Sequence, residues 1–517
     1  MKRIFLLSMA VLWQVITIAQ SECDWADLQW GENIKRPPGR YWGTQEFGPD
    51  LYMSVWRDGD EVHLITTTGN MNIIKQREVE IVHQAKKGKW YFERFFRLGT
   101  NMYVMSKIKV KKEEKFYYYV QAINPESLEL EEEPTLIGDM TFLRSSFKEL
   151  EDITIAPDYS KFYFGHNNGT RDLSKFWYEV QIIDADLETV YEDKITIEND
   201  EALNTAYIDF YKNGDVAVLA KRSKEKEDKE KGKPNYYYTA AVMRSGEVSK
   251  YTLDLSEYFI SGAGITFGQE GEIILSGYYS TISANKVNGV FFMKEDVDSE
   301  TLEPAVFNEF SIEEITKFAS EKSEKKNKKK EAKGKEIEFN DFDVFDLIAT
   351  SEGVYLLGEQ SWMYVTYTYT SNGTRTVYHY VFADVMAMKF DYDGEIQWTT
   401  RLPKWQHSTN DGGPYSSFNY DIEGNSVYIL YNDHIDNHTM FDPKKVRPTP
   451  WGGDKSVTSI AKIDSEGELT KGYLYNVKEE ALFTKVRESS SLDGETGFMI
   501  MAQKKKNIKF AKVTVEE

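Results

Sequence analysis

A repeat that runs through this chain limits its fold more than any other feature. An aromatic-rich run, closed by an acidic or glycine-containing turn and followed by a more polar run, occurs at residues 116–123, 176–183 and 236–243. The ends of these three copies are 60 residues apart. Tyr, Phe, Val, Ile and Thr dominate the runs, and these residues favour β-strands. One unit of several strands is therefore expected to be built repeatedly along the chain.

Further copies occur at residues 290–293, 385–390 and 459–463, and the chain ends on a strand-like run at 508–515. Units of four strands that recur about every 40 to 60 residues are typical of a β-propeller. We therefore predict an all-β fold, a β-propeller with seven or eight four-stranded blades. Tandem β-sandwiches are the alternative, because they share short alternating strands. Since the last unit stops after its third strand, a strand near 41–47 is expected to close the ring by supplying the outer strand.

Two segments are expected to stand out from the repeated unit. Thr and Tyr alternate at residues 366–370 before Asn372 and Gly373, a sequence that predicts a hairpin. Residues 316–338 are rich in Lys and Glu, so we predict a solvated insertion there.

The N-terminus indicates export. Lys2 and Arg3 precede a mostly apolar run that ends at Ala19, the pattern of a cleaved signal peptide over residues 1–20. Residues 24–517 are then predicted to form a single β-propeller domain in the periplasm, on the outer surface or outside the cell. No second apolar stretch of spanning length follows, so the mature chain is expected to lack a transmembrane segment.

Charge and cysteine content exclude several classes of protein. The chain carries 84 acidic and 63 basic residues, a formal charge of −21, whereas a nucleic-acid partner would require a basic face. Cys23 is the single cysteine, which excludes a disulfide framework and a cysteine-built metal site. Glu22 fits poorly before a lipoprotein cysteine, and whether Cys23 is lipidated stays open. Nucleophile-elbow, phosphate-loop and zinc-protease motifs are absent from the sequence.

The segment 403–439 is the richest in groups that could bind a ligand, and it holds three of the seven histidines. Its candidate ligand-binding residues are His407, Asn410, Asp411, Asp433, His434 and Asp436. We expect two loops here, whose oxygen atoms would suit Ca²⁺ and whose imidazoles would suit another divalent metal. The competing interpretation is that Asn and Asp cap local turns, and it is the favoured one.

Aromatic residues are concentrated in one unit, as Trp362, Tyr364, Tyr367, Tyr369, Trp398 and Trp405. Exposed flat rings would stack on sugars, whereas rings on neighbouring strands would pack against one another within the sheet. Packing is the favoured prediction.

The stretch 388–398 resembles the strand–turn–strand of quinoprotein-like propeller repeats, with Asp391 and Gly394 in the turn and Trp398 after it. In that family the Trp docks against the neighbouring blade. Three stretches, 275–293, 353–360 and 398–432, are similar to uncharacterised exported bacterial proteins. The resemblance implies export and a propeller-like body, and it assigns no activity.

These observations favour a binding or scaffold protein for an envelope protein or glycan, with no cofactor predicted. The alternative is a propeller-type hydrolase that acts on extracellular polysaccharide through carboxylates near the ring axis. Fold alone does not imply chemistry, so the non-catalytic function is preferred.

Overall fold

The computed structural model describes residues 23–516, apart from 49, 60, 82–88, 132, 142–150, 170–175, 198–203, 212–214, 225–226, 245–246, 254, 284–285, 312–338, 341, 371–372 and 493. The predicted signal peptide at 1–20 and the predicted insertion at 316–338 lie outside these residues. Within them, the chain is built almost entirely of antiparallel β-sheet. None of the described helices has both the length and the apolar character needed to cross a membrane.

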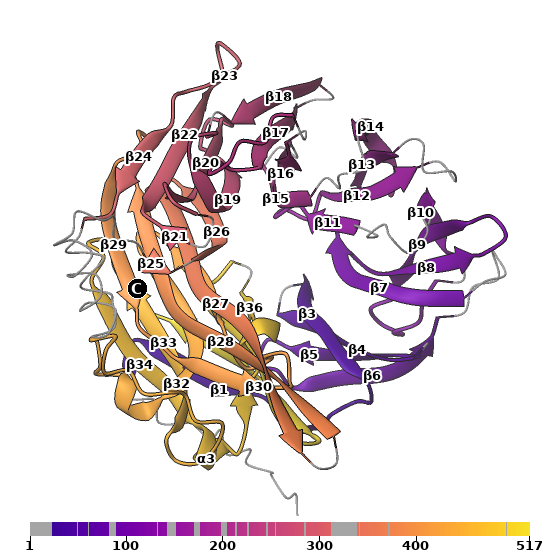
Figure 1. Ribbon diagram of the computed structural model, residues 1–517. Helices are drawn as coiled ribbons and strands as arrows, with labels where there is room; N and C mark the ends of the chain where they lie inside the picture. Colours follow the sequence, from indigo (N-terminus) through magenta and orange to yellow (C-terminus); the bar gives the residue numbers. More distant parts are fainter. Residues whose placement is uncertain are drawn as a thin grey trace, which may run out of the picture.

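The described residues form eight blades around one axis, which confirms the predicted β-propeller (Figure 1). Blade 1 consists of β3 (Arg40–Gly48), β4 (Leu51–Asp58), β5 (Glu61–Thr68) and β6 (Ile73–Glu80), and blade 2 of β7 (Lys89–Leu98), β8 (Asn101–Val110), β9 (Lys115–Ile123) and β10 (Thr135–Thr141). Blade 3 consists of β11 (Glu151–Ile155), β12 (Lys161–Gly169), β13 (Phe176–Asp184) and β14 (Thr189–Ile197), and blade 4 of β15 (Asn204–Phe210), β16 (Val216–Ser223), β17 (Tyr236–Arg244) and β18 (Glu247–Leu253).

Blades 5, 6 and 8 are less regular than the others, because extra short strands join them, whereas blade 7 has four strands. Blade 5 consists of β19 (Phe259–Phe267), β20 (Ile273–Ser280), β22 (Gly289–Asp296), β23 (Thr301–Leu302) and β24 (Val306–Glu309), and blade 6 of β26 (Asp343–Thr350), β27 (Gly353–Thr370), β28 (Gly373–Phe390), β29 (Ile396–Leu402) and β30 (Gln406–Thr409). Blade 7 consists of β31 (Phe418–Glu423), β32 (Ser426–His434), β33 (Ser456–Ile463) and β34 (Leu469–Asn476). Blade 8 consists of β35 (Phe483–Thr484), β36 (Ser490–Ser491), β37 (Gly497–Lys504), β38 (Asn507–Val515), β1 (Ala26–Trp30) and β2 (Ile34–Lys35). Outside the blades are the β21–β25 pair (Lys286–Val287 with Phe339–Asn340) and the short helical turns η1 (Ile435–Asn437), α3 (Val477–Glu480) and η2 (Val486–Glu488).

The ring closes through the N-terminal segment, but not through the strand that we predicted. β1 pairs along β38 as the outer strand of blade 8, whereas residues 41–47 lie in β3, the first strand of blade 1. Ala26 and Leu28 alternate inward from β1 and pack into the core between blades 7 and 8. Because its apolar residues alternate, this short strand can bury one face in the core while it pairs with β38 at the edge of blade 8.

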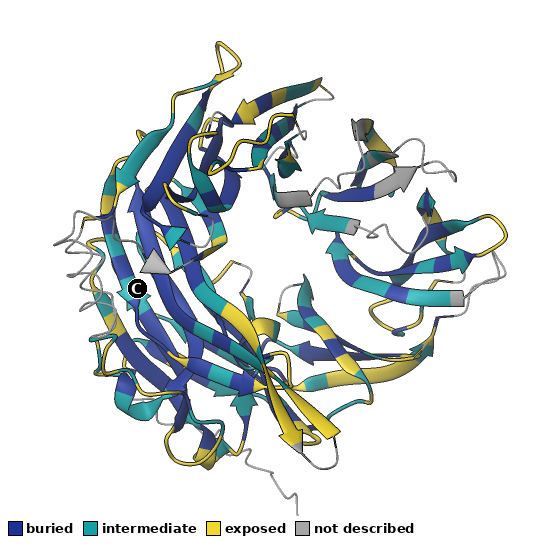
Figure 2. Ribbon diagram, viewed as in Figure 1, coloured by how far each residue is buried: buried dark blue, intermediate teal, exposed yellow. Residues whose placement is uncertain are grey.

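The apolar core is divided among the spaces between blades. Each of eight large hydrophobic clusters draws its members from two neighbouring blades, and blade 8 packs on blade 1 in the same way. On β27, for example, Val354 and Leu356 pack toward blade 5, while Tyr355 and Leu357 pack toward blade 7. Since both faces of a middle strand are covered, such strands are continuously apolar rather than alternating (Figure 2).

The turn that resembles quinoprotein repeats joins β28 to β29 within blade 6, and Trp398 after it packs against blade 7. The carboxylate of Asp391 accepts the backbone N–H groups of Asp393 and Glu395, and Gly394 adopts a positive φ of 85°. Trp398 lies against the corresponding turn of blade 7, where a Cβ on Gly467 would approach its side chain to 2.8 Å. The tryptophan therefore packs against the next blade.

The first strands of the blades are also joined to one another near the axis. The hydroxyl of Tyr420 on β31 donates to Asp346 on β26. Asp209 on β15 accepts hydrogen bonds from the Thr266 hydroxyl and the Phe267 N–H on β19, at 3.0 and 3.2 Å. These bonds hold consecutive blades together at the centre of the ring.

Cys23 lies at the start of the described chain and is 3% exposed. It packs against blade 7, where a Cβ on Gly472 would meet the cysteine Cβ at 2.9 Å. Burial raises the pKa of its thiol to about 11. A lipid attached to Cys23 would require this packing to open.

Candidate functional site

A pocket of about 720 Å³ lies between blades 8 and 1. One wall carries positive side chains from β2 and from the β37–β38 turn, namely Lys35, Arg36 and Lys506. The opposite wall is formed by β5 and β6, and it includes His63 and Glu78. Arg77 on β6 also lines this second wall, so both walls carry positive groups, and only the second offers an imidazole and a carboxylate.

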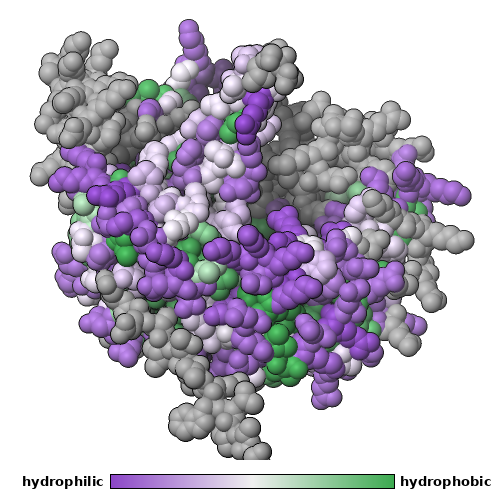
Figure 3. Space-filling model, turned by 90° about the horizontal axis from the view of Figure 1, so that it is seen from below, coloured by the Kyte–Doolittle hydropathy of each residue, from purple (hydrophilic) through white to green (hydrophobic). Residues whose placement is uncertain are grey.

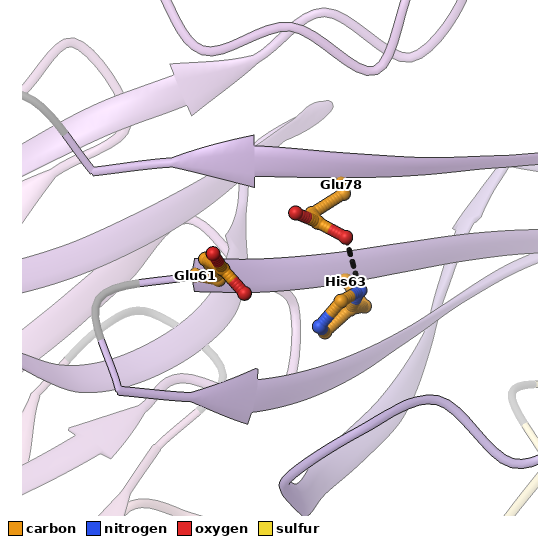
Figure 4. A group of neighbouring side chains, drawn as sticks. All are labelled: Glu61, His63 and Glu78. Carbon is orange, nitrogen blue, oxygen red and sulfur yellow. Dashed lines mark ion pairs between the residues drawn. The ribbon is translucent and has the colours of Figure 1, made fainter.

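Three side chains converge on the wall formed by blade 1. Glu61 and His63 are two residues apart on β5 and therefore share a face, and Glu78 on β6 is the cross-strand partner of His63. Each offers a ligand atom, and these atoms all lie within 4.8 Å of one another. Figure 4 shows the imidazole beside both carboxylates, with the ion pair to Glu78 dashed. We call this group the carboxylate–imidazole cluster.

His63 is unusual because it occupies a position where the strand is otherwise apolar. It lies between the buried residues Val62 and Leu64 and is itself only 8% exposed. Its Nδ1 lies 3.5 Å from Glu78 Oε2, while its Nε2 is buried without a hydrogen-bond partner. Glu61 and Glu78 are exposed at the strand surface. The cluster thus combines one enclosed nitrogen with mobile carboxylates.

The residues predicted from the sequence fall into two separate places, of which the first is the base of the long hairpin. His407 lies on β30, where its Nε2 is 2.9 Å from His379 Nδ1. Asn410 has a positive φ of 56°, and its side chain accepts the N–H of Tyr378. Asp411 accepts hydrogen bonds from the Ser408 hydroxyl and the Gly413 N–H. Asp411 thus shapes this turn by local contacts, while Asn410 ties the turn to β28.

The second place is the end of β32. His434 caps the turn η1 by accepting the N–H of Asp436 at its Nδ1, and Asp436 makes ion pairs with Arg447 and Lys455. Asp433 is buried: its Oδ1 accepts a hydrogen bond from Asn437, and its Oδ2 lacks a hydrogen-bond partner. Burial raises the pKa of Asp433 to about 7. Over the part of the chain that the structure describes, none of the six predicted residues belongs to a potential metal-binding group.

Asp433 borders a set of buried charges between blades 6 and 7 that we call the enclosed network. Lys404 Nζ lies 2.5 Å from Glu359 Oε1, and both side chains are almost fully buried. Glu359 also accepts a hydrogen bond from the Ser417 hydroxyl at 2.6 Å. Nearby, Lys471 donates to the carbonyl groups of Asn437 and Met440, and burial lowers its pKa to about 8. Nearly every group in this network is satisfied from within the protein.

The β27–β28 hairpin confirms the hairpin predicted from the alternating Thr and Tyr residues, and its far end projects from the ring (Figure 2). One of its faces is partly covered. The ring of Tyr364 stacks on His379, with centroids 4.4 Å apart, and Trp362 contacts Trp405 edge-on at 5.6 Å. On this face, cross-strand packing of aromatic rings is observed as predicted.

The other face of the hairpin, which we call the outer hairpin face, is exposed. By strand alternation and register, it carries Met363, Tyr367 and Tyr369 on β27 and Tyr378 on β28. Their exposed fractions are 57, 59, 82 and 45%. Packing within the sheet was the wrong prediction for Tyr367 and Tyr369. On the face seen in Figure 3, the coloured side chains are largely hydrophilic, and hydrophobic ones gather in separate groups.

Sequence reasoning missed the carboxylate–imidazole cluster and the enclosed network. A signal for the first was present, since His63 interrupts an apolar run and follows Glu61 by two residues. The cross-strand position of Glu78 could not be read in the same way, because it depends on the register of β5 with β6.

No protein-family model matches the chain, and no curated protein matches it. Solved structures with a similar arrangement include an uncharacterised protein from Listeria monocytogenes, with a TM-score of 0.36 and 9% identity over 80% of this chain and 92% of that one. The β-propeller domain of the trilobed protease from Pyrococcus furiosus has a TM-score of 0.35 and 11% identity over 84% of this chain and 97% of that one. The polysaccharide lyase Uly1 has a TM-score of 0.36 and 10% identity over 97% and 100%. Likenesses this distant assign no function to this chain.

Proposed function

We propose that this protein is a β-propeller that binds a protein or glycan partner outside the cytoplasm, as a binding or scaffold protein without catalysis. The outer hairpin face is the observation that carries this proposal. Four large side chains lie together there on a projecting hairpin, and each is at least 45% exposed. Exposed groups of this kind mark interaction sites in soluble proteins.

The hairpin also has an open edge. β26 pairs with β27 only as far as Glu359, so within the described residues the part of β27 beyond it is bonded to β28 alone. Unpaired N–H and C=O groups along such an edge can accept a strand from another chain. Tyrosine rings on the adjoining face would stack on sugars or pack against apolar side chains. Both the backbone and the side chains of this hairpin are therefore available to a partner.

A substitution on the outer hairpin face tests the proposal. We would replace Tyr367 and Tyr369 by Ser together and measure binding to a panel of oligosaccharides and to cross-linked envelope extract. Because both rings are exposed, we expect the unfolding midpoint to change little and binding to fall at least tenfold. Ile74→Ser is the matched control, since Ile74 is 53% exposed on a different blade. Binding that survives the double substitution would refute this surface as the site.

A propeller-type hydrolase is the second candidate, and one observation near the axis favours it. The carboxylates of Asp209 and Asp346 are half-buried on the first strands of blades 4 and 6, on either side of blade 5, and burial raises the pKa of each. Both are close enough to Tyr420 to raise the pKa of its hydroxyl further. Glycoside hydrolysis requires two carboxyl groups on opposite sides of the scissile bond, one of them with a raised pKa, and these two residues are the candidates near the axis.

Release of reducing sugar from a panel of polysaccharides separates the two candidates. A hydrolase that uses this pair should lose essentially all activity in Asp346→Asn, while the binding protein should release no sugar at all. Activity that persists in Asp346→Asn would exclude this pair as the catalytic group.

A further inference from the structure

We propose that Glu61, His63 and Glu78 form a binding site for a divalent transition-metal ion on blade 1. The proposal is independent of the partner-binding function and of the residues predicted from the sequence. Among the described residues, this is the one group of His, Cys, Asp and Glu side chains close enough to share an ion.

The strand geometry places the three ligands on one side of an ion. Glu61 and His63 point to the same face of β5, and Glu78 stands opposite His63 on β6. Ligands at about 2.1 Å from a tetrahedral zinc ion are about 3.4 Å from one another. The present spacing of up to 4.8 Å is therefore slightly wide. The exposed Glu61 and Glu78 side chains are free to rotate and close it.

The buried imidazole is a second, independent indication of a ligand. A buried polar nitrogen without a partner costs about 1–3 kcal/mol, and most such groups in proteins are satisfied. His63 Nε2 is buried and lacks a partner, although the ring lies beside two carboxylates. Nδ1 lies 3.5 Å from Glu78 Oε2, so an ion would bind either at Nε2, which the fold leaves unsatisfied, or at Nδ1 in place of that contact.

The surrounding charges give a third indication. Glu61 is the direct cross-strand partner of Glu80, and both side chains are exposed. Like charges directly opposite one another destabilise a sheet, and a bound cation would relieve this repulsion. Glu80 lies at the same edge of the face and could supply a further oxygen ligand.

The ligand set also indicates the class of ion. An imidazole suits Zn²⁺, Cu²⁺, Fe²⁺ or Ni²⁺, whereas Ca²⁺ prefers six to eight oxygen ligands. Lys35, Arg36 and Lys506 line the same pocket as His63 and Glu78, and so does Arg77 on β6. These positive charges would repel a cation that was held by long-range electrostatic attraction alone. Binding must therefore depend on coordination bonds, and we expect a strong preference for Zn²⁺ over Ca²⁺.

Thermal unfolding of the untagged chain, stripped with a chelator and then supplied with Zn²⁺, Mn²⁺ or Ca²⁺, tests the site. Selective binding to the folded state raises the unfolding midpoint. We expect a rise with Zn²⁺ that is lost on adding chelator, and little change with Ca²⁺. Glu78→Gln and Glu61→Gln should each weaken Zn²⁺ binding, measured by calorimetry. Loss of a residue that only orients a metal ligand costs about 10- to 100-fold in affinity, and loss of a ligand itself should cost at least as much. Glu247→Gln, an exposed carboxylate on β18, is the matched control and should bind normally.

A spectroscopic measurement keeps the proposal testable if the variants differ in stability. Zinc-edge X-ray absorption of the loaded chain should show one imidazole among oxygen ligands, and the imidazole signal should vanish in His63→Gln. The proposal is overturned if Zn²⁺ leaves the midpoint unchanged. It is equally overturned if Glu61→Gln and Glu78→Gln bind Zn²⁺ as tightly as the control. In that case Glu78 serves only as the structural partner of His63.

Discussion

The carboxylate–imidazole cluster and the enclosed network are both groups of charges between neighbouring blades, yet they differ in how far the fold satisfies them. In the network, Lys404 and Glu359 are buried together, and Ser417 and Gln406 complete their hydrogen bonds. In the cluster, the carboxylates reach solvent and one imidazole nitrogen has no partner. The difference indicates that the network holds blades 6 and 7 together, while the cluster is available to a ligand.

The largest expected effect comes from opening the enclosed network. Lys404→Met would leave the Glu359 carboxylate buried without its cation. Breaking one side of a buried ion pair costs about 3–5 kcal/mol, so we expect a loss of that size in the free energy of unfolding, measured with urea. Lys404→Met combined with Glu359→Gln should recover much of it. A single-variant loss below about 1 kcal/mol would mean that water reaches this pair.

Asp433 should make stability depend on pH in the same region. The folded state holds its proton to a pKa of about 7, whereas an unfolded aspartate releases it near 3.9. Between these values the folded state binds more protons, so stability falls as the pH rises. Asp433→Asn should remove this loss. We expect no gain near pH 4 and a gain of up to about 4 kcal/mol at pH 8, seen in unfolding curves across that range. A gain that did not vary with pH would contradict this assignment.

In the carboxylate–imidazole cluster, replacing the buried polar group should cost little without metal. His63→Leu removes a ring whose Nε2 is unsatisfied and substitutes an apolar side chain in an apolar strand. We expect less than about 1 kcal/mol of change in the metal-free free energy of unfolding, because no strong hydrogen bond is lost. A much larger loss would mean that His63 holds blade 1 as firmly as Lys404 holds blade 6.

The smallest effect is expected from Glu78→Gln in the absence of metal. The Glu78 side chain is 58% exposed, and exposed pairs contribute little because water screens them. We expect a change within about 0.5 kcal/mol, measured by urea unfolding alongside Glu247→Gln. A clear loss of stability in Glu78→Gln alone would indicate that its ion pair with His63 is structural.

Several features of the molecule could be predicted from local sequence alone. The 60-residue spacing of the aromatic runs corresponds to the third strands β9, β13 and β17 of successive blades. The alternating Thr and Tyr residues correspond to the β27–β28 hairpin. The strand that closes the ring was misplaced because Ala26, Leu28 and Trp30 offer only three alternating positions, a weak signal beside the longer run in β3.

The candidate residues of segment 403–439 show where such reasoning stops. Asp411 and His434 accept backbone N–H groups two residues further along the chain, which is what such residue types favour in turns, whereas Asn410 and Asp436 bond to residues more than ten positions away. Asp433 differs because it is buried, and this burial raises its pKa. Adjacent residues with similar propensities thus have different chemistry.

Strand content, the repeated blade and the turn residues of this protein follow from its sequence, since each depends on neighbours within a few positions and on the two-residue period of a strand. Only the assembled blades show that His63 pairs with Glu78 and that Lys404 is buried with Glu359. Each pair joins residues that different strands bring together, and burial sets how strongly their charges interact. Register and burial are properties of the packed ring, and they decide which of its charged groups are available for binding.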